Sequence, residues 1–452
     1  MFVPARHGGD LMSGRHFFGG VHPEYHKEMT AGKAIEAMPM PEKLVVHFAQ
    51  NIGSMPTPLV KRGDQVKKGQ VIAEASGFVS VPVHAPTSGK VEAVDMFPNP
   101  VGAETLAAVI APDGEDAWAE GLNVEQDTDS MNGDQIKGLI RDAGLVGMGG
   151  ATFPTHVKLS PPEGKYIDTL ILNGAECEPY LTADHRLMLE HPAEILEGAS
   201  FFARVLDVKR VIVAIEKNKP DAIEKMKKAV EVKEGYSVEA LDVVYPQGAE
   251  KQLIFALTGR RVPAGGLPMD VNVLVQNVGT AFAAYEAVRF KRPLLERVVT
   301  VTGNGVAEPK NIRARIGTRF EDMIDRCGGL AEDTVKVISG GPMMGVAQYS
   351  LDAAVTKGTS GIVTLRKDEV VQFVSDPCIR CGRCVEACPM RLNPSALSIF
   401  IEMCHFEDAA EYHVTDCIEC GSCAYVCPSQ RPLVHHFRRA KAEIRKMSRK
   451  AG

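Results

Sequence analysis

The chain has 452 residues, of which 45% are hydrophobic and 24% are charged, and its formal net charge is −6. This composition is typical of globular proteins and excludes a disordered chain, and the length predicts about three or four domains rather than a single core. No apolar run approaches the ~18 residues of a membrane-spanning helix, and the N-terminal residues lack the basic-then-apolar pattern of a signal peptide. We therefore expect a cytoplasmic chain.

Residues 40–110 are predicted to form short strands separated by turns. Residues 60–73 alternate apolar and polar positions around Gly-Asp and Gly-Gln turns, and residues 83–91 supply a second half. This pattern resembles the barrel-sandwich fold of biotinyl and lipoyl carrier domains. Carrier domains present a modifiable lysine at the hairpin tip between the two halves, but the tip at residues 75–78 has none. We expect an unmodified structural or docking module.

Residues 121–292 are predicted to alternate strands and helices. Residues 166–172 and 209–215 are short apolar runs rich in branched residues, which suit a buried parallel sheet. Residues 220–230 begin with a proline and space their apolar residues as a helix does. This region is therefore predicted to be an α/β domain.

The segment 144–158 is dense in glycine. Glycines allow backbone amides to approach a phosphate or a flat ring, and a lysine adds positive charge. The residues concerned are Gly147, Gly149, Gly150 and Lys158. Glycine loops are often only tight turns, so this segment alone is a weak signal.

Three other segments fit the same site. Polar groups at the carboxyl ends of strands lie where open α/β sheets bind ligands, and amides and carboxylates suit ribityl hydroxyls, ring nitrogens or the ribose of a nicotinamide cofactor. The residues concerned are Asn173, Glu176 and Glu178 after the strand predicted at 166–172, then Gly248 and Glu250, and finally Asn277 and Thr280.

Residues 293–366 are predicted to be rich in strands, with Gly/Pro turns around one helix at 319–327. The pattern resembles a small β-grasp domain of the SLBB type. The predicted fold is thus a multidomain α/β chain with a barrel-sandwich hybrid, a Rossmann-like domain, a β-grasp domain and a ferredoxin-like domain. The predicted bounds are 1–120, 121–292, 293–366 and 367–452.

Two copies of Cys-x2-Cys-x2-Cys-x3-Cys-Pro, starting at residues 378 and 417, are the strongest signal in the chain. Two-cluster bacterial ferredoxins use this run, in which three close cysteines hold one iron–sulfur cube and the fourth reaches the other. Zinc is the main alternative, but zinc ribbons use two separate Cys-x2-Cys pairs. We expect one [4Fe-4S] cluster on Cys378, Cys381, Cys384 and Cys427, and a second on Cys388, Cys417, Cys420 and Cys423.

These cysteines require a reducing compartment. Of the other three, Cys327 and Cys404 are predicted to be buried as small apolar residues, and Cys177 is expected beside the cofactor. From Arg438 to Lys450 the chain carries seven Lys/Arg and one acid. This basic helix could meet anionic lipid or an acidic partner subunit, or simply cover the clusters as a solvated helix; nucleic acid is not expected.

The four site segments, in this order, are similar to the FMN- and NADH-binding region of the flavoprotein subunit of respiratory complex I. Residues 15–445 as a whole resemble the C subunits of Rnf-type ion-translocating ferredoxin:NAD oxidoreductases. The segments 19–23, 83–89, 174–180 and 340–345 and both cysteine motifs carry this resemblance.

The resemblance implies a role for each site residue. Gly147, Gly149, Gly150 and Lys158 would hold FMN, with Asn173, Glu176, Asn277 and Thr280 beside it. Glu178, Gly248 and Glu250 would lie where NAD or NADH stacks and its ribose is bound. The complex I pattern has Arg, Gly and an aromatic residue where Met148, Thr152 and Leu159 stand here, so the phosphates and the adenine would be held differently.

The implied function is an oxidoreductase that links hydride exchange between NADH and FMN to one-electron transfer through two clusters, with no catalytic side chain. The implied partners are the other subunits of a membrane complex and, through one of them, ferredoxin. The implied location is peripheral, on the cytoplasmic face of the inner membrane. The alternatives are a soluble cobalamin-reductase-type flavoprotein, which lacks the ~120 residues ahead of the glycine loop, and an electron-relay subunit without an active nucleotide site.

Overall fold

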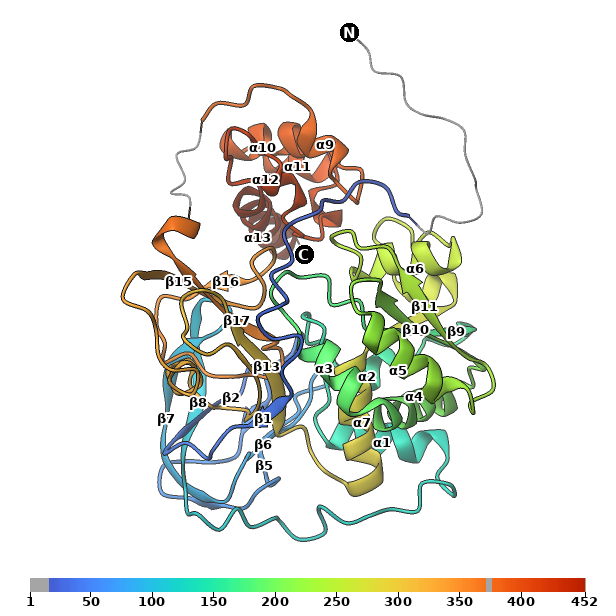
Figure 1. Ribbon diagram of the computed structural model, residues 1–452, viewed down its shortest axis with the longest axis vertical. Helices are drawn as coiled ribbons and strands as arrows, with labels where there is room; N and C mark the ends of the chain where they lie inside the picture. The colour runs from blue at the N-terminus through green and yellow to red at the C-terminus, as the bar shows by residue number, and fades with distance from the viewer. Residues whose placement is uncertain (1–15, 371–375, 452) are drawn as a thin grey trace.

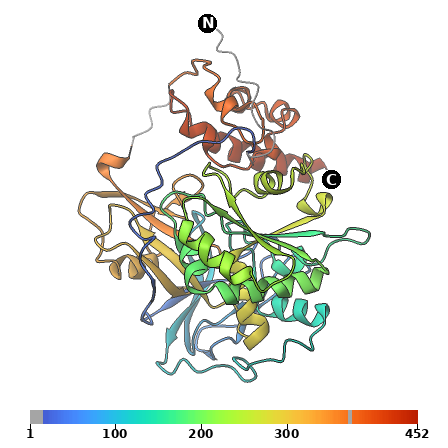
Figure 2. The ribbon, with the colours of Figure 1, turned by 45° about the vertical axis from the view of Figure 1, so that its right-hand side comes forward.

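The computed structural model describes residues 16–370 and 376–451. A helical domain with both cysteine motifs lies at one end of the molecule, next to the α/β region and the β-rich regions (Figure 1). The same arrangement is visible after a 45° turn (Figure 2). Among the described helices, none is long and apolar enough to cross a membrane.

The α/β region contains a parallel sheet with the strand order β11-β10-β9-β12. Its strands are β9 (Thr169–Asn173), β10 (Arg210–Glu216), β11 (Tyr236–Leu241) and β12 (Val273–Asn277). The branched residues of β9 and β10 are buried on both faces of the sheet, as in parallel sheets covered by helices. β9 begins three residues later than predicted, and Tyr166, ahead of it, is 68% exposed.

Helices cover both faces of this sheet. They are α1 (Gly133–Asp142), α2 (Thr155–Lys158), α3 (Ala183–Glu190), α4 (Pro192–Leu206), α5 (Pro220–Val230), α6 (Glu250–Thr258) and α7 (Val278–Phe290), with a short 3-10 helix η1 (Pro268–Val271). One apolar core joins α1, α4, α5 and α7, and a second joins α6 to the opposite face. The helix predicted at 220–230 is α5, with Met226 buried inside the core as its spacing predicted.

The barrel-sandwich region consists of two small sheets around one core. The strands are β2 (Leu44–His47), β4 (Gln65–Val66), β7 (Gly89–Asn99) and β8 (Ala103–Pro112) in the first sheet, and β3 (Thr57–Pro58), β5 (Val71–Glu74) and β6 (Val83–His84) in the second. Leu44, Ile72 and Ile110 meet in the core between them. The hairpin tip at 75–78 ends in an exposed Phe78 and carries no lysine, as predicted.

The β-grasp region has a six-stranded sheet in the order β1-β14-β13-β17-β15-β16. Its elements are β1 (Ile35–Ala37), β13 (Glu296–Thr302), β14 (Lys310–Arg315), β15 (Thr334–Ser339), β16 (Val346–Ala347), β17 (Gly361–Arg366) and the helix α8 (Phe320–Asp325). The helix predicted at 319–327 is shorter at both ends, because Arg319 takes an extended conformation and Cys327 follows the last helical turn. Strand β1 comes from the N-terminal segment, which the sequence did not indicate.

The cluster region is built from short helices. After a 3-10 turn, η2 (Lys367–Glu369), come α9 (Arg383–Glu386), α10 (Pro394–Glu402), α11 (Phe406–Glu411), η3 (Val414–Asp416), α12 (Ser422–Tyr425) and α13 (Leu433–Ala451). Leu433 and Phe437 of α13 pack on α10 and on Cys423. The basic helix therefore covers the cysteine-bearing loops with its apolar face.

Candidate functional site

The predicted site residues gather at the point where the order of the parallel strands reverses. β10 pairs with one side of β9 and β12 with the other. The register places Asn173 opposite Asn277, at the carboxyl ends of these two strands. Ligands of open α/β sheets bind in the crevice at such a switch point. The two asparagines therefore mark the base of a candidate ligand site.

The glycine-rich loop lies beside this end of the sheet, since a Cβ on Gly149 would be 3.4 Å from the Cβ of Asn277. The main-chain N–H of Met148 donates to the Thr280 hydroxyl at 2.9 Å, which ties the loop to α7. The N–H of Gly147 donates to the carbonyl of Phe153 at 2.8 Å and closes the loop. Gly149 and Gly150 are exposed, and Gly150 has a φ of +126°, where a side chain is strained. A Cβ on Gly150 would meet no atom within 4 Å, so the loop leaves open space beside it.

Asn277 and Thr280 are used by the fold itself. The Asn277 Oδ1 accepts from the N–H groups of Gly279 at 2.8 Å and Thr280 at 3.3 Å and so caps α7. Its Nδ2 donates to Asp184 at 2.6 Å. Both Asn277 and Thr280 are buried, so they shape the crevice and the start of α7 rather than present free side chains.

Lys158 and Glu250 form an ion pair at the edge of the crevice. The Lys158 Nζ donates to Glu250 Oε1 at 2.8 Å and to the carbonyl of Val275 at 2.7 Å. Both side chains are partly exposed. A pair of this kind contributes no more than about 1 kcal/mol. Because this ion pair is weak, the Lys158 ammonium group can donate to a ligand phosphate in place of Glu250.

The loop after β9 connects the crevice to α3 and α6. The Asn173 Nδ2 donates to the carbonyl of Gly248 at 2.9 Å, so these two predicted residues are in direct contact. The Glu176 carboxylate accepts from the N–H groups of Asp184 at 2.7 Å and His185 at 3.2 Å, in the first turn of α3. Glu176 therefore caps a helix, which fixes the path of the loop.

Glu178 is bound by the β-grasp region. Its carboxylate accepts from the main-chain N–H groups of Met343 at 3.1 Å and Met344 at 2.8 Å. Burial raises the pKa of Glu178 to about 7. A Cβ on Gly341 would lie 2.2 Å from its Oε2, so only glycine allows this close approach. The carboxylate joins two regions of the chain, and its oxygens are already engaged.

Four buried charged groups around this loop were missed by the sequence analysis. Lys27 is 8% exposed and Lys219 is completely buried, and burial lowers the pKa of Lys27 to about 8. Burial, reinforced by the Glu176 carboxylate, raises the pKa of Asp184 to about 7. Burial also lowers the pKa of Arg297 to about 10. None of the four lies in a recognisable motif. The only hint in the sequence was the pair Glu176 and Glu178 in the loop after β9, because buried carboxylates need nearby positive charges.

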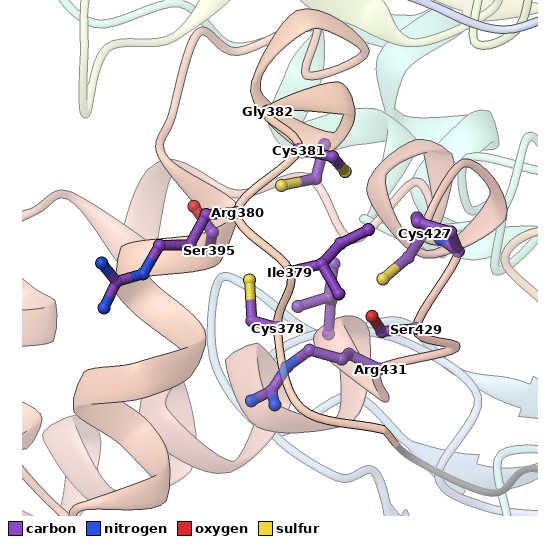
Figure 3. Close-up of a pocket in the computed structure, with 12 residues that line it drawn as sticks. Cys378, Ile379, Arg380, Cys381, Gly382, Ser395, Cys427, Ser429 and Arg431 are labelled. Atoms are coloured by element: carbon purple, nitrogen blue, oxygen red, sulfur yellow. The ribbon is translucent and has the colours of Figure 1, made fainter.

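The cysteines predicted for the first cluster line one cavity. The four are Cys378, Cys381, Cys384 and Cys427. Figure 3 shows the sulfur atoms of Cys378, Cys381 and Cys427 directed toward the space between them. The last cysteine of the second motif thus lies with the first three cysteines of the first motif.

The remaining four motif cysteines form a second group. The charges of Cys388 and Cys420 act on Cys417, whose pKa burial raises to about 11. Cys388 and Cys417 accept N–H···S bonds from Leu392 at 3.4 Å and Glu419 at 3.3 Å. Cys423 completes the group and is buried.

The second cysteine group borders the crevice loops. The Tyr245 hydroxyl donates to the carbonyl of Cys420 at 2.8 Å. Val21, Tyr245, Ala387 and Cys420 form one apolar cluster, against which Cys177 packs. The loop of Tyr245 and the loop after β9 are thus in direct contact with the cysteine-bearing loops.

The two other cysteines outside the motifs differ from each other. Cys327 is fully buried, as predicted. The prediction for Cys404 was wrong: it is exposed, in a left-handed turn after α10, and its sulfur accepts from Arg439 at 3.2 Å. Leu397 and Ile401 of α10 pack in one core with Leu433 and Phe437 of α13, and Cys404 lies outside that core.

The residues present fit the predicted cofactors. Two sets of four thiols offer only sulfur ligands, as [4Fe-4S] clusters require. Within the residues that the structure describes, no three His, Cys, Asp or Glu side chains are close enough to hold a single metal ion. For FMN, the open glycine loop offers exposed amides, and the buried amide of Gln276 next to Asn277 has no hydrogen-bond partner.

Family models match four parts of the chain in the predicted order. They are the RnfC barrel sandwich hybrid domain (residues 15–115), the Nuo51 FMN-binding domain (140–286), the SLBB domain (298–347) and the 4Fe-4S dicluster domain (369–431). These matches confirm the predicted multidomain fold and the predicted FMN and iron–sulfur cofactors.

Close relatives extend over nearly the whole chain. The C subunit of the proton-translocating ferredoxin:NAD(+) oxidoreductase complex of Clostridium ljungdahlii is 52% identical over 95% of this chain and 94% of its own length. The C subunit of the Na(+)-translocating ferredoxin:NAD(+) oxidoreductase complex of Acetobacterium woodii is 45% identical over 96% and 98%. A crystal structure of NAD+-reducing [NiFe]-hydrogenase matches with a TM-score of 0.49 and 18% identity, over 73% of this chain and 68% of the other. The chain belongs to the family of C subunits of Rnf-type ion-translocating ferredoxin:NAD oxidoreductase complexes.

Proposed function

We propose that this chain is the nicotinamide-reactive subunit of an ion-translocating ferredoxin:NAD oxidoreductase and converts hydride exchange into one-electron transfer. When bound, a flavin exchanges a hydride with a nicotinamide and single electrons with iron–sulfur clusters, which carry one electron at a time. The chain itself binds, orients and insulates these groups. No side chain is assigned as a general acid or base.

The contact between the crevice loops and the second cysteine group carries this proposal. The Tyr245 hydroxyl donates to the carbonyl of Cys420, and Cys177 of the loop after β9 packs on the same apolar cluster. A converter needs its hydride-handling site and its first one-electron carrier to be close together and shielded from water. The apolar contact supplies both conditions.

The residue assignments belong to the same proposal. FMN is held by the glycine loop and the ends of β9 and β12, through Gly147, Gly149, Gly150, Lys158, Asn173, Glu176, Asn277 and Thr280. The nicotinamide nucleotide binds beside it, near Glu178, Gly248 and Glu250. Asn277, Thr280 and Glu176 act by fixing the loops, because their polar atoms are already bonded within the fold.

We infer the partners from the family and propose a location that suits them. Relatives of this chain are named as subunits of ferredoxin:NAD(+) oxidoreductase complexes. We therefore expect this chain to pass electrons to other subunits of such a complex, and to ferredoxin through one of them. Its position is peripheral, on the cytoplasmic face of the inner membrane.

An electron relay without nucleotide reactivity is the second candidate. It is favoured by Met148 and Leu159, which stand where the complex I pattern has an arginine and an aromatic residue. Met148 is 5% exposed and Leu159 is 2% exposed, so both side chains pack into the core.

One titration separates the two candidates. The full chain is purified without oxygen, its clusters are reconstituted, FMN is added, and NADH is titrated while the visible spectrum is recorded. Bleaching of the flavin band followed by reduction of an added one-electron acceptor supports the converter. Bound FMN that NADH leaves oxidised supports the relay.

A variant pair makes the titration specific to the site. Lys158→Met removes the ammonium group at the edge of the crevice and should weaken FMN binding. Lys165→Met removes an ammonium that is bonded to Asp270 on the surface, and should bind FMN as the unaltered chain does. Equal FMN affinity in both variants would refute the assignment of Lys158.

A further inference from the structure

The N-terminal segment contacts three other regions before it enters the barrel sandwich. We define residues 16–30 as the N-terminal strap. Figures 1 and 2 show this blue segment passing the cluster domain and running along the molecule to β1. After the strap, β1 pairs with β14 of the β-grasp sheet. The strap and β1 therefore join the cluster, α/β and β-grasp regions.

The first contact of the strap is with the second cysteine group. The N–H of Gly20 donates to the carbonyl of Ala387 at 3.0 Å, next to Cys388. Val21 and Tyr245 exchange two main-chain hydrogen bonds of 2.9 Å. A Cβ on Gly19 would lie 2.9 Å from backbone atoms of Ala387 and Cys388. The strap thus bonds both to the cluster loops and to the loop of Tyr245.

The second contact is made by Lys27. Its buried Nζ donates to the carbonyls of Glu176 at 2.9 Å, Glu178 at 2.9 Å and Leu181 at 2.5 Å. An ammonium group has three hydrogens, and these three carbonyls use all of them. The ammonium group of Lys27 is therefore fully bonded to one loop, residues 176–181.

The loop that Lys27 holds is the one that carries the function proposed above. Between Asn173 and α3 it bears Cys177, which packs beside Cys420, and Glu178, which holds the loop of Met343. Tyr180 of the same loop stacks on His26 of the strap, with ring centroids 4.7 Å apart. Its main-chain N–H also donates to the carbonyl of Tyr25 at 2.7 Å.

We propose that the N-terminal strap sets the spacing between the flavin-site loop and the second cluster, and that Lys27 is its principal positioning residue. Lys27 acts through the loop backbone: its ammonium group bonds to the main-chain carbonyls of Glu176 and Glu178 and not to their carboxylates. The inference goes beyond the proposed function, because it concerns which element joins the regions. It holds whether or not the nucleotide reacts.

Two matched pairs of variants test the strap. Lys27→Met removes the three buried hydrogen bonds at nearly constant volume, and Lys33→Met removes one exposed bond to the carbonyl of Pro309. Gly19→Ala forces the strap away from Cys388. Gly32→Ala places its Cβ in open space, with no atom within 4 Å.

Two readouts separate positioning from general loss of structure. Hydrogen–deuterium exchange of peptides covering 174–182 should be roughly tenfold to a hundredfold faster in Lys27→Met, since hydrogen bonds to a charged group are lost locally. Cluster reduction in a single turnover should slow by roughly tenfold, because small displacements of a reacting pair are costly. Iron content should match that of Lys33→Met.

The exchange measurement needs no NADH, so failure of the nucleotide reaction does not obscure the result. Equal exchange and equal cluster reduction in Lys27→Met and Lys33→Met would overturn the proposal. If Lys27→Met loses its cofactors or fails to fold, the glycine pair decides. Gly19→Ala must then loosen peptides 174–182 and 385–390 while Gly32→Ala does not; equal exchange in both refutes a positioning strap.

Discussion

The fourth cysteine of each motif should serve the cluster of the other motif. Cys427 belongs to the second motif but lines the cavity of Cys378, Cys381 and Cys384. The Cys427→Ala variant should therefore lose the first cluster. A loaded chain carries about eight iron atoms in two cubes, and each single variant should keep about four. Cys388→Ala should instead lose the second cluster.

Two double variants test the cross-pairing of the fourth cysteines, because they should differ in iron content by about four atoms per chain. Cys381→Ala with Cys427→Ala removes two ligands of one cluster and should keep about four iron atoms. Cys420→Ala with Cys427→Ala removes one ligand from each cluster and should keep nearly none. Iron and labile sulfide are measured after anaerobic reconstitution, and the low-temperature electron paramagnetic resonance of the surviving cluster identifies it. Circular dichroism verifies that the helices persist.

The opposite ranking would refute the reasoning. If each fourth cysteine served its own motif, the double variant of Cys420 and Cys427 would keep four irons and that of Cys381 and Cys427 would keep none. The spectra give a second test. The surviving cluster of Cys427→Ala should match that of Cys381→Ala and differ from that of Cys388→Ala.

Three further predictions follow from single contacts. Lys158→Met should weaken FMN binding by roughly tenfold to a hundredfold, measured by flavin fluorescence, because one charge-assisted hydrogen bond contributes about 1.5–3 kcal/mol; an unchanged affinity would remove Lys158 from the site. Gly198→Ala places a Cβ 1.8 Å from a backbone oxygen of α7 and should destabilise the protein, because overpacking of about 3 kcal/mol exceeds the helix-propensity gain of about 1 kcal/mol. Gly138→Ala is the control: its Cβ meets no atom within 4 Å and should stabilise α1 by about 1 kcal/mol. Urea denaturation compares the two, and equal stability would contradict the packing argument. Burial raises the pKa of Asp184 to about 7, so the native state holds this proton more tightly than the unfolded chain and stability falls as the pH rises from about 4 to 7. Asp184→Asn should flatten that part of the melting profile between pH 5 and 7, and an unchanged slope would show that Asp184 does not cause it.

The buried charges explain how the separate regions are held together. Lys27 reaches the loop after β9 from the strap, and Glu178 reaches the β-grasp loop from the α/β sheet. Each is a buried ionisable side chain whose polar atoms bond to main-chain groups of another region. Such contacts are directional and costly to leave unmade, so they specify one arrangement of the regions more sharply than apolar packing alone.

The amino-acid pattern alone was enough to predict the cofactors and several local elements. The spacing of the cysteine motifs places sulfur atoms at fixed chain separations, and the helix α5 (Pro220–Val230) begins and ends where its proline and its apolar spacing predicted. The branched residues of β10 likewise indicated a strand buried on both faces. These features depend on neighbours within about ten residues along the chain, which is the range that periodicity and turn chemistry report.

How these elements meet depends on contacts between residues that lie far apart in the sequence. The tertiary structure placed β1 in the β-grasp sheet, gave the oxygens of Glu178 to the amides of Met343 and Met344, and left Cys404 outside the core. It also brought Lys27 to carbonyls about 150 residues away along the chain. Contacts over such separations arise when whole elements pack together, and a lysine in a polar segment carries no local sign that it will be buried. Sequence separation explains both results. The motif residues were predictable because their patterns are local, whereas the contacts of the strap join residues far apart in the sequence and are seen only in the folded chain.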